Sequence, residues 1–253
     1  MTALLMLLYG VATYGFFLAT FVYAIGFVAG VPVLPTTIDG PASFGWADAV
    51  PVNLALLGLF AVQHSVMARP AFKRAWTRVV PEPVERSTFV LAATAALALL
   101  CWQWRPIATP MIWQVTSPTA TFVLYALAAT GWVVLLISTF LINHFELFGL
   151  RQVWTNVMGR TMPAADFRTP GFYRHVRHPL YVGFLIGFWA TPTMTAGHLL
   201  FALASTGYIL IGIWFEERDL VAQFGERYRA YRTQVGMLIP TFRRANGERP
   251  AQH

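Results

Sequence analysis

The sequence predicts an all-α integral membrane protein. Apolar residues make up 57% of its 253 positions and charged residues only 11%, whereas about a quarter of the residues in a soluble domain are charged. Several apolar runs reach the length of about 20 residues that a helix needs to cross a bilayer. The basic residues fall into a few short segments between these runs, which is typical of loops on one side of a membrane.

Four apolar runs are expected to be single membrane-spanning helices, over roughly residues 3–29, 49–68, 88–104 and 119–142. A fifth region, residues 180–215, is too long for one span. Pro192 and Gly197 interrupt it near its middle, so a helical hairpin is expected there. The chain is therefore expected to have about six membrane-embedded helices, or five spans if residues 180–217 form only a partial hairpin. The first run lacks a basic leader and is expected to be a retained helix.

The positions of the 18 lysines and arginines predict the orientation. Five lie within 69–86, five within 144–179 and seven after Phe215, so only Arg105 lies elsewhere. Because basic loops stay in the cytoplasm, both termini are expected to be cytoplasmic. The net charge of +7 is interpreted as an orientation signal and a contact with lipid headgroups. A nucleic-acid partner is not expected, because the charges are divided among three short segments, and the oligomeric state is left open.

Cysteine content and chain organisation narrow the possibilities further. Cys101 is the only cysteine, which excludes an intramolecular disulfide and a multi-cysteine metal site. It falls within the third apolar run, where we expect a small buried hydrophobic residue. No internal repeat divides the chain, so residues 1–253 are expected to form a single domain. The proline- and glycine-rich residues 31–47 predict an external loop.

Two clusters of ionisable residues flank the hairpin region. The first is Arg177-His178-Pro179-Leu180-Tyr181-Val182-Gly183, and the second is Glu216-Glu217. Ionisable groups are costly to place at the edge of a membrane, and they therefore indicate a functional site by default.

The first cluster combines a helix start with cationic side chains. Pro179 suits the first turn of a helix, where its missing N–H costs nothing, and the remaining free N–H groups of that turn can receive an anion. Arg177 and His178 add cationic or hydrogen-bonding character beside that turn. Tyr181 lies on the same rim, and Gly183 leaves room for close approach. The alternative is that Arg177 and His178 are ordinary interfacial anchors.

The second cluster directly follows the last apolar run and is expected to open the next helix, where negative charge is favourable. Glu216 and Glu217 are then either solvated residues or residues of which one binds the amine or hydroxyl groups of a ligand. The residues that follow place an apolar stripe on a basic helix, at Leu220, Phe224, Tyr228 and Tyr231. Such a stripe predicts a C-terminal amphipathic cytoplasmic helix that lies on the membrane surface or caps the site.

The residues around both clusters form a spaced pattern that resembles a known group of enzymes. The pattern reads T-x-G-x-Y-x-x-x-R-H-P-x-Y-x-G from Thr169 to Gly183, and then E-E-x-x-L-x-x-x-F-G-x-x-Y-x-x-Y from Glu216 to Tyr231. It resembles the cofactor-binding half of the isoprenylcysteine carboxyl methyltransferase-like membrane enzymes. The resemblance implies that S-adenosyl-L-methionine is the cofactor and that its binding residues are Gly171, Tyr173, Arg177, His178, Pro179, Leu180, Tyr181, Gly183, Glu216 and Glu217.

The rest of the chain is similar to a narrower group, the NnrU-like membrane proteins. The segments that carry this similarity are residues 63–70, 85–88, 102–106 and 143–152. Within that family the resemblance is to members that methylate methanethiol. It implies methyl transfer from S-adenosyl-L-methionine to this small volatile thiol, giving dimethyl sulfide and S-adenosylhomocysteine. It also implies a bacterial inner membrane. Residues 1–143 are expected to be the N-terminal helices and the substrate side, residues 144–242 the cofactor-binding half, and residues 243–253 a mobile tail.

One position departs from the isoprenylcysteine enzymes. Those enzymes carry an arginine for the substrate carboxylate five residues before the second glutamate, where this chain has Gly212. Burying an unpaired carboxylate is unfavourable. A small neutral thiol is therefore expected to fit better than a prenylated amino acid.

Methyl transfer to a thiol is helped by a group that draws the proton from sulfur, because the thiolate is the better nucleophile. Three candidates lie near the cytoplasmic ends of the second and fourth apolar runs: His144, His64 and Glu146. For each histidine the alternative is a structural hydrogen bond between helices, and His144 is placed ahead of His64. Tyr173 and Tyr181 are the aromatic residues expected to shield a sulfonium. His198, at the external turn, is not a candidate.

Two other functions fit the sequence. One changes only the acceptor, to another small thiol, a lipid amine or an isoprenoid. The other is a non-catalytic haem-binding or transport protein linked to nitrogen-oxide metabolism, an association that NnrU-like proteins carry. In that case His64 and His144 are expected to be axial haem ligands, but the R-H-P-x-Y-x-G and E-E elements remain unexplained.

Overall fold

The computed structural model describes residues 2–42, 44–164 and 166–240. The elements within them are, in chain order, α1 (Ala3–Val28), α2 (Trp46–Ala68), α3 (Pro70–Trp76), α4 (Glu82–Gln103), β1 (Met111–Gln114), α5 (Pro118–Ile142), α6 (His144–Leu147), α7 (Leu150–Val157), the 3-10 helix η1 (Gly171–Arg174), α8 (Pro179–Trp189), β2 (Thr193–Thr195), α9 (Ala196–Phe224) and α10 (Glu226–Gln234). The expected all-α architecture is confirmed, and the two short strands are its only departure within the described residues.

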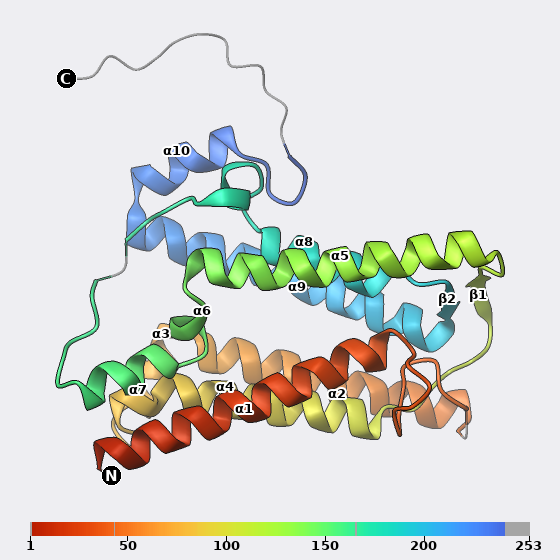
Figure 1. Cartoon of the computed structure of the whole chain (residues 1–253), viewed down its shortest axis with the longest axis horizontal. Coiled ribbons are helices and arrows are strands. Elements are labelled where there is room, and N and C mark those ends of the chain that lie inside the picture. The colour runs from red at the N-terminus through yellow and green to blue at the C-terminus, as the bar shows by residue number, and fades with distance from the viewer. Residues whose placement is uncertain (1, 43, 165, 241–253) are drawn as a thin grey trace, which may run out of the picture.

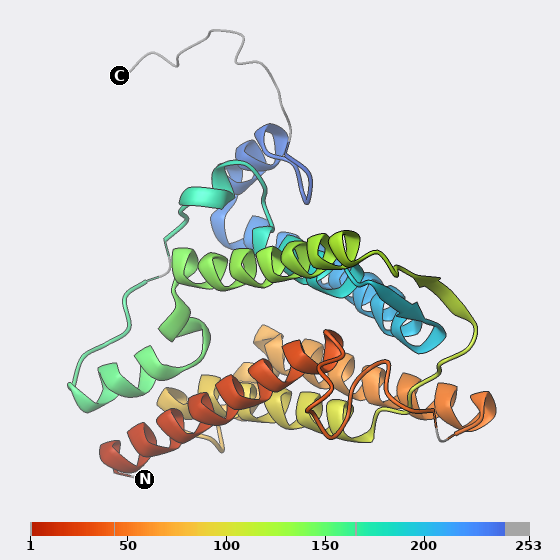
Figure 2. The same cartoon turned by 45° about the vertical axis from the view of Figure 1, so that its right-hand side comes forward.

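Figures 1 and 2 show that the helices form two layers. In one layer α1 and α2 both pack on α4, and in the other α5 packs on α8, with α9 alongside. After α5 the chain crosses back to the first layer through α6 and α7, and α7 packs on α1 and α4. The division predicted between residues 1–143 and 144–242 therefore does not coincide with the division between the two layers.

Among the described residues, five helices are long and apolar enough to cross a membrane, namely α1, α2, α4, α5 and α9. Many large apolar side chains on these helices are exposed, as expected where the surrounding medium is lipid. The first four of these helices match the four predicted single spans to within a few residues, except that α4 begins six residues earlier. The protein is thus an integral membrane protein, as its composition predicts.

The predicted hairpin consists of one short and one long helix. Helix α8 has 11 residues and covers only about 16 Å at about 1.5 Å per residue, roughly half the thickness of the hydrocarbon core. Residues 190–195 complete the passage, and β2 there pairs antiparallel with β1. The structure therefore matches the partial-hairpin alternative, with its break at Pro192 and with Gly197 already inside α9.

The two ends of the bundle differ in composition, and we name them by their contents. The motif end holds the start of α8, the last turns of α9 and α10, together with the N-terminal end of α1 (Figure 1). The sheet end holds β1, β2 and the loop between α1 and α2 (Figure 1). Both ionisable clusters singled out in the sequence lie at the motif end.

Two glycines let α5 and α8 approach closely. A side chain at Gly183 would meet the backbone oxygen of Gly131 at 2.6 Å, and one at Gly131 would meet the oxygen of Gly183 at 2.8 Å. Small residues at such crossings are typical of helix packing in membranes. The space expected beside Gly183 for a ligand is therefore filled by α5.

The last long helix differs from the prediction. Glu216 and Glu217 do not open a new helix; they lie inside α9, which continues without a break to Phe224. The prediction was wrong because hydropathy falls at Phe215 while the helical backbone does not end there. Gly225, with a φ of 56°, separates α9 from α10, so the predicted apolar stripe is divided between two helices. The tail predicted at residues 243–253 lies outside the described residues.

Candidate functional site

A backbone contact with the C-terminal segment fixes the start of α8. Val176 and Gly236 form a parallel bridge. The Arg177 N–H donates to the Gly236 oxygen at 2.9 Å, and the His178 N–H donates to the Met237 oxygen at 3.2 Å. Helix α8 then begins at Pro179, as predicted. The segment after α10 therefore holds the R-H-P turn in place.

Glu217 is the centre of a closed ion-pair network. Arg177 Nε donates to its Oε1 at 2.7 Å, His178 Nε2 lies 3.1 Å from the same oxygen, and Arg232 Nε lies 3.1 Å from Oε2. Arg177 also donates to the backbone oxygens of Arg232 and Val235. The side chains of Arg177 and Glu217 are only 10% and 9% exposed. Charges so far from water require such partners, so Glu217 links α8, α9 and α10.

Glu216, its neighbour in the chain, has a different environment. Tyr181 donates its phenolic hydrogen to Glu216 Oε2 at 3.0 Å, and His178 Nδ1 lies 3.8 Å from the same oxygen. The Glu216 side chain is 45% exposed, and so is that of Arg232. One carboxylate and one guanidinium at the motif end are thus both positioned and accessible.

Tyrosine side chains surround these carboxylates. Tyr231 donates to the backbone oxygen of Tyr173, and Tyr228 is fully buried beside Tyr231. Burial raises the pKa of Tyr231 to about 12. Burial and then the nearby Glu216 carboxylate raise the pKa of Tyr173. Both phenols therefore stay protonated at neutral pH.

The loop before η1 covers α10. Phe167 packs its ring 5.4 Å from that of Phe224 and 5.7 Å from that of Tyr228. Arg227 lies over the Phe167 ring at 5.9 Å. The apolar stripe, predicted to lie on the membrane surface or to cap the site, therefore packs in part against a loop of the same chain.

Three further residues were predicted to bind the cofactor, and two of them have packing contacts in the structure. Gly171 has a φ of 51°, and a side chain there would meet Leu141 at 2.9 Å, so its backbone conformation and its packing both favour glycine. Its predicted contact with a cofactor stays a prediction. Gly183 packs on α5, as described above. Leu180 is half-buried, and its predicted contact with a cofactor stays a prediction.

Gly212 faces the accessible part of the site. A side chain built on it would come no nearer than 4.0 Å to any atom outside its own helix, and that atom is the Tyr181 hydroxyl. The position at which the isoprenylcysteine enzymes carry an arginine is therefore open and next to the rim residue Tyr181.

His144 has both ring nitrogens occupied. Thr139 donates its hydroxyl hydrogen to Leu136, so it accepts from His144 Nδ1 at 2.8 Å. Tyr14 then donates to His144 Nε2 at 2.7 Å. The ring is 4% exposed, and burial lowers its pKa. His144 is thus a neutral histidine that joins α1 to α5.

His64 lies in a different environment. Its ring is stacked on Phe60 at 5.4 Å and lies 6.4 Å from Tyr208 of α9. Its Nδ1 atom is buried and has no hydrogen-bond partner among the described residues. A buried polar atom without a partner calls for an explanation, such as a water or a ligand group.

The contact between α2 and α9 places His64 near the accessible site. Just beyond α2, Arg69 pairs with Asp219 at 3.1 Å and lies over the Phe215 ring at 4.8 Å. Phe215 and Asp219 flank the Glu216-Glu217 pair in the chain. His64 therefore lies at the contact between α2 and α9, the helix that carries Glu216, whereas His144 lies at the contact between α1 and α5.

Glu146 is held locally. Arg151 Nη1 lies 2.6 Å from its Oε2, and Asn143 donates to the same oxygen at 2.7 Å. It also lies on α6, in the chain's return to the first layer. These contacts stabilise the turn between α5 and α7 and leave Glu146 no visible part in the site.

Sequence reasoning missed two residues of this region. Arg232 was counted only as a basic residue of the C-terminal segment, and Tyr208 was not singled out. The one available signal for Arg232 is its place one turn after Tyr228 on the predicted amphipathic helix. Nothing in the local sequence marks Tyr208 as the neighbour of His64, because the two residues lie 144 positions apart.

The fold and this region together define a polytopic α-helical membrane protein with an accessible polar site at one end of its bundle. The NnrU protein family matches residues 53–231, and the chain belongs to this family. No solved structure matches the chain.

Several relatives are similar over most of their length. Methanethiol S-methyltransferase 1 of Bradyrhizobium diazoefficiens is 54% identical, over 92% of this chain and 81% of its own. Methanethiol S-methyltransferase of Mycobacterium tuberculosis is 55% identical, over 93% of this chain and 96% of its own. Nurim of Rattus norvegicus is 33% identical, over 71% of this chain and 68% of its own.

Proposed function

We propose that this protein is a membrane methyltransferase that transfers a methyl group from S-adenosyl-L-methionine to methanethiol, giving dimethyl sulfide and S-adenosylhomocysteine. The observation that carries the proposal is the accessible Glu216 carboxylate, which Tyr181 holds beside the closed network of Glu217. Relatives that are 54% and 55% identical bear the name of this activity, and they support the choice of acceptor.

The residues at the motif end fit a ligand of mixed charge. Glu216 offers a carboxylate to an amine or to ribose hydroxyls, and the accessible guanidinium of Arg232 offers a partner to a carboxylate. The ring of Tyr181, whose hydroxyl donates to Glu216, and the ring of Tyr173 are proposed to provide faces for a cation. When bound there, S-adenosyl-L-methionine supplies a methyl group activated by a sulfonium.

The acceptor thiol has to lose its proton. Its S–H bond breaks, and its sulfur forms a new bond to the methyl carbon while the donor's S–CH₃ bond breaks. The products are two neutral thioethers and one proton, which carries the positive charge that the sulfonium had. A buried hydrogen-bond acceptor beside the thiol helps, because the thiolate is the stronger nucleophile. The chain's task is therefore to hold the sulfur in line with the methyl group and to receive a proton.

His64 suits this task better than His144, which reverses the order expected from the sequence. Its unpartnered Nδ1 is free to accept from a thiol, and its neighbour Tyr208 lies on the helix that carries Glu216. Both nitrogens of His144 have protein partners, and neither is free to take a proton or to ligate haem iron.

The open position at Gly212 supports a small neutral acceptor. An arginine there would reach the Tyr181 hydroxyl and provide a charge for a carboxylate substrate. This chain therefore supplies no cation from position 212. Methanethiol requires none.

For the location, we propose the bacterial inner membrane, with both termini and the motif end in the cytoplasm. The segments with many basic residues lie near α3, α7 and α10, which share one end of the bundle (Figure 1). Basic loops are retained in the cytoplasm, where S-adenosyl-L-methionine is made and used.

The reaction is tested by headspace gas chromatography on the purified protein in detergent, with S-adenosyl-L-methionine and methanethiol supplied together and separately. We expect dimethyl sulfide only when both are present. No product despite calorimetric binding of the cofactor would overturn methanethiol as the acceptor. No product and no binding, together with a strong haem absorption band, would overturn the enzyme itself.

The role of His64 is tested by a matched pair of variants, His64→Gln and His144→Gln. We expect His64→Gln to lower kcat by about 100-fold, within the range for loss of a general base, without changing the Kd for the cofactor. The loss should shrink as the pH approaches the thiol's own pKa. We expect His144→Gln to lower the Tm while kcat stays within a few-fold. The opposite pattern would assign the role to His144.

A further inference from the structure

A small cavity, largely enclosed and called here the closed cavity, lies between the two layers of helices. Its volume is about 60 Å³, and residues of α1, α4, α5, α8 and α9 line it with no polar surface. Aromatic rings form much of its wall, among them Phe21, Trp132, Phe184 and Phe188, and Cys101 lies on the α4 side. These rings contact one another with centroids 5.5–6.4 Å apart. The cavity is thus a feature of the interface between layers.

The apolar wall of the cavity determines which small molecules can bind in it. A buried water needs two to four polar partners, and the wall of this cavity offers none. A guest must therefore be neutral and apolar, and it can have only a few heavy atoms. Sulfur makes favourable contacts with aromatic rings, so a small thiol or thioether matches both the volume and the wall.

The cavity adjoins the proposed reaction site. Phe184 and Phe188 follow Tyr181 on α8 by three and seven residues, or about 4 Å and about 10 Å along the helix axis. Tyr181 packs against the same apolar cluster as the cavity residues, and its hydroxyl reaches Glu216. The cavity and the rim of the site therefore share one apolar cluster of side chains.

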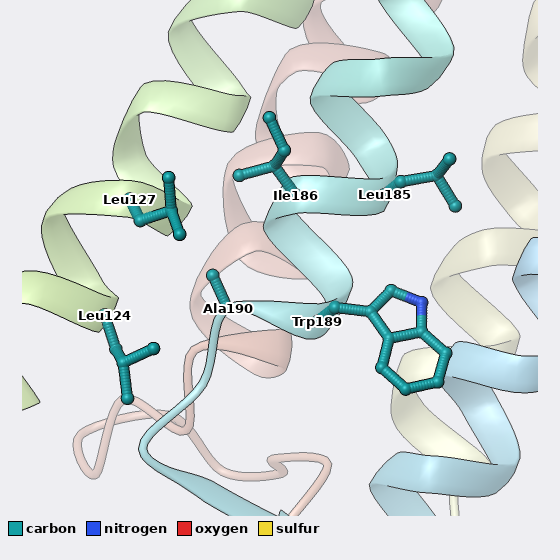
Figure 3. A pocket seen from close by; sticks show the side chains of 6 residues that line it. All are labelled: Leu124, Leu127, Leu185, Ile186, Trp189 and Ala190. Atoms are coloured by element: carbon teal, nitrogen blue, oxygen red, sulfur yellow. The ribbon is translucent and has the colours of Figure 1, made fainter. Parts of the chain in front are cut away.

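A second recess shows that α8 is apolar on its outer side as well. It measures about 410 Å³, is open, and is lined by Leu124 and Leu127 of α5 and by Leu185, Ile186, Trp189 and Ala190 of α8 (Figure 3). Phe184 and Phe188 point to a different face of α8, toward the closed cavity. The short helix α8 is thus the partition between an open apolar recess and the closed cavity.

We propose that the closed cavity holds the acceptor, a neutral sulfur compound with two or three heavy atoms, on its way between the bilayer and the site. This inference rests on the proposed function and adds to it a binding site and a route. Methanethiol and dimethyl sulfide both dissolve in apolar media. The interior of the bundle therefore serves as the acceptor's side of the enzyme, while the motif end serves the charged cofactor.

The first test fills the cavity. Ala24 lines it, whereas Ala19, on the same helix, is exposed. We expect Ala24→Leu to raise the KM for methanethiol by about tenfold, the lower end of the effect of one methylene in an apolar pocket. The matched Ala19→Leu variant should behave as the wild type. The Kd for S-adenosyl-L-methionine should not change in either.

The second test enlarges the cavity. Leu97 lines it, while Leu91 is a half-buried leucine on the same helix that does not. We expect Leu97→Ala to raise the ratio of kcat/KM for 1-propanethiol over methanethiol by about tenfold or more. Leu91→Ala should leave the ratio unchanged. This variant decides the question even if Ala24→Leu does not fold.

A binding measurement separates this proposal from the reaction. Because a ligand that binds the folded state raises the Tm, dimethyl sulfide should raise the Tm of the wild type and of Ala19→Leu but not that of Ala24→Leu. An active wild type with unchanged KM in Ala24→Leu, an unchanged thiol ratio in Leu97→Ala and equal Tm shifts would overturn the cavity. An inactive wild type that still shows the selective Tm shift would overturn the reaction instead.

Discussion

The two ends of the bundle both contain a histidine beside a carboxylate, but only at the motif end is the neighbouring residue in the chain a second, accessible carboxylate. At the sheet end, His198 Nδ1 lies 2.9 Å from Asp39 Oδ2 and its Nε2 lies 3.0 Å from the Phe188 oxygen. Thr195 donates to the other Asp39 oxygen at 2.6 Å. His198 is fully buried. At the motif end, Glu217 is equally enclosed, but Glu216 beside it is 45% exposed.

The two ends show how a structural cluster of ionisable residues can be told from a binding site. At the sheet end both ring nitrogens of His198 and both carboxylate oxygens of Asp39 have hydrogen-bond partners within the chain. This cluster holds the loop after α1 against α8 and α9. At the motif end the closed cluster of Glu217 fastens three helices, and Glu216 and Arg232 remain beside it for a ligand. Residue type alone does not distinguish these two cases. They differ in the exposure of the ionisable side chains and in whether all their polar atoms have partners within the chain.

The largest effect is expected from Glu217→Gln. The amide keeps the shape but removes the charge that faces Arg177, Arg232 and His178. Breaking a buried ion pair by removing one partner costs about 3–5 kcal/mol. Thermal unfolding in detergent should show a large fall in Tm, and cofactor binding should weaken with it.

The control for that variant is Glu226→Gln, which removes an exposed carboxylate paired only with Arg229 on the same helix. It should leave the Tm nearly unchanged. Equal Tm values for the two variants would mean that the network of Glu217 does not hold the helices together.

A smaller loss of stability is expected from His198→Ala at the sheet end. The change leaves Asp39 with Thr195 as its remaining partner and leaves the Phe188 oxygen buried without a donor. Such losses cost about 2–3 kcal/mol. Calorimetric affinity for S-adenosyl-L-methionine should stay the same, since the sheet end and the motif end are opposite ends of the bundle (Figure 1). A fall in affinity without a fall in Tm would contradict the structural role.

His144 offers a third comparison, at a saturated histidine near the motif end. Because burial lowers its pKa in the folded state, the unfolded chain binds a proton there at higher pH than the folded one does. Its contribution to stability is therefore present above pH 6.5 and is lost as the pH falls through the lowered pKa. Between pH 7 and 5 the wild type should lose a few degrees more Tm than His144→Gln. An equal loss in both would show that His144 does not titrate in this way.

The apolar helices and the start of the site could be predicted because their causes are local. Hydropathy marks the four single spans, Pro179 marks the start of α8, and Pro192 marks the break before α9. Cys101 is buried, as expected for a small residue in a span. Each of these features depends on neighbours within a few residues.

The remaining features depend on contacts between distant residues, and no local pattern shows them. Strands β1 and β2 pair across 78 residues or more, and Arg232 meets Glu217 only because α10 folds back over the site. His198, set aside because of its position at the external turn, is a buried link between that turn and the first loop. The order of His144 and His64 likewise depends on Tyr14 and Tyr208, which lie far from them in the chain.

The most direct test of the account is a calorimetric comparison of S-adenosyl-L-methionine binding to the wild type, Glu216→Gln and His198→Ala. A hydrogen bond to a charged group contributes about 1.5–3 kcal/mol, so Glu216→Gln should weaken binding by at least about tenfold without lowering the Tm. His198→Ala should lower the Tm without weakening binding. Unchanged affinity in Glu216→Gln would contradict the claim that the accessible carboxylate at the motif end holds the cofactor.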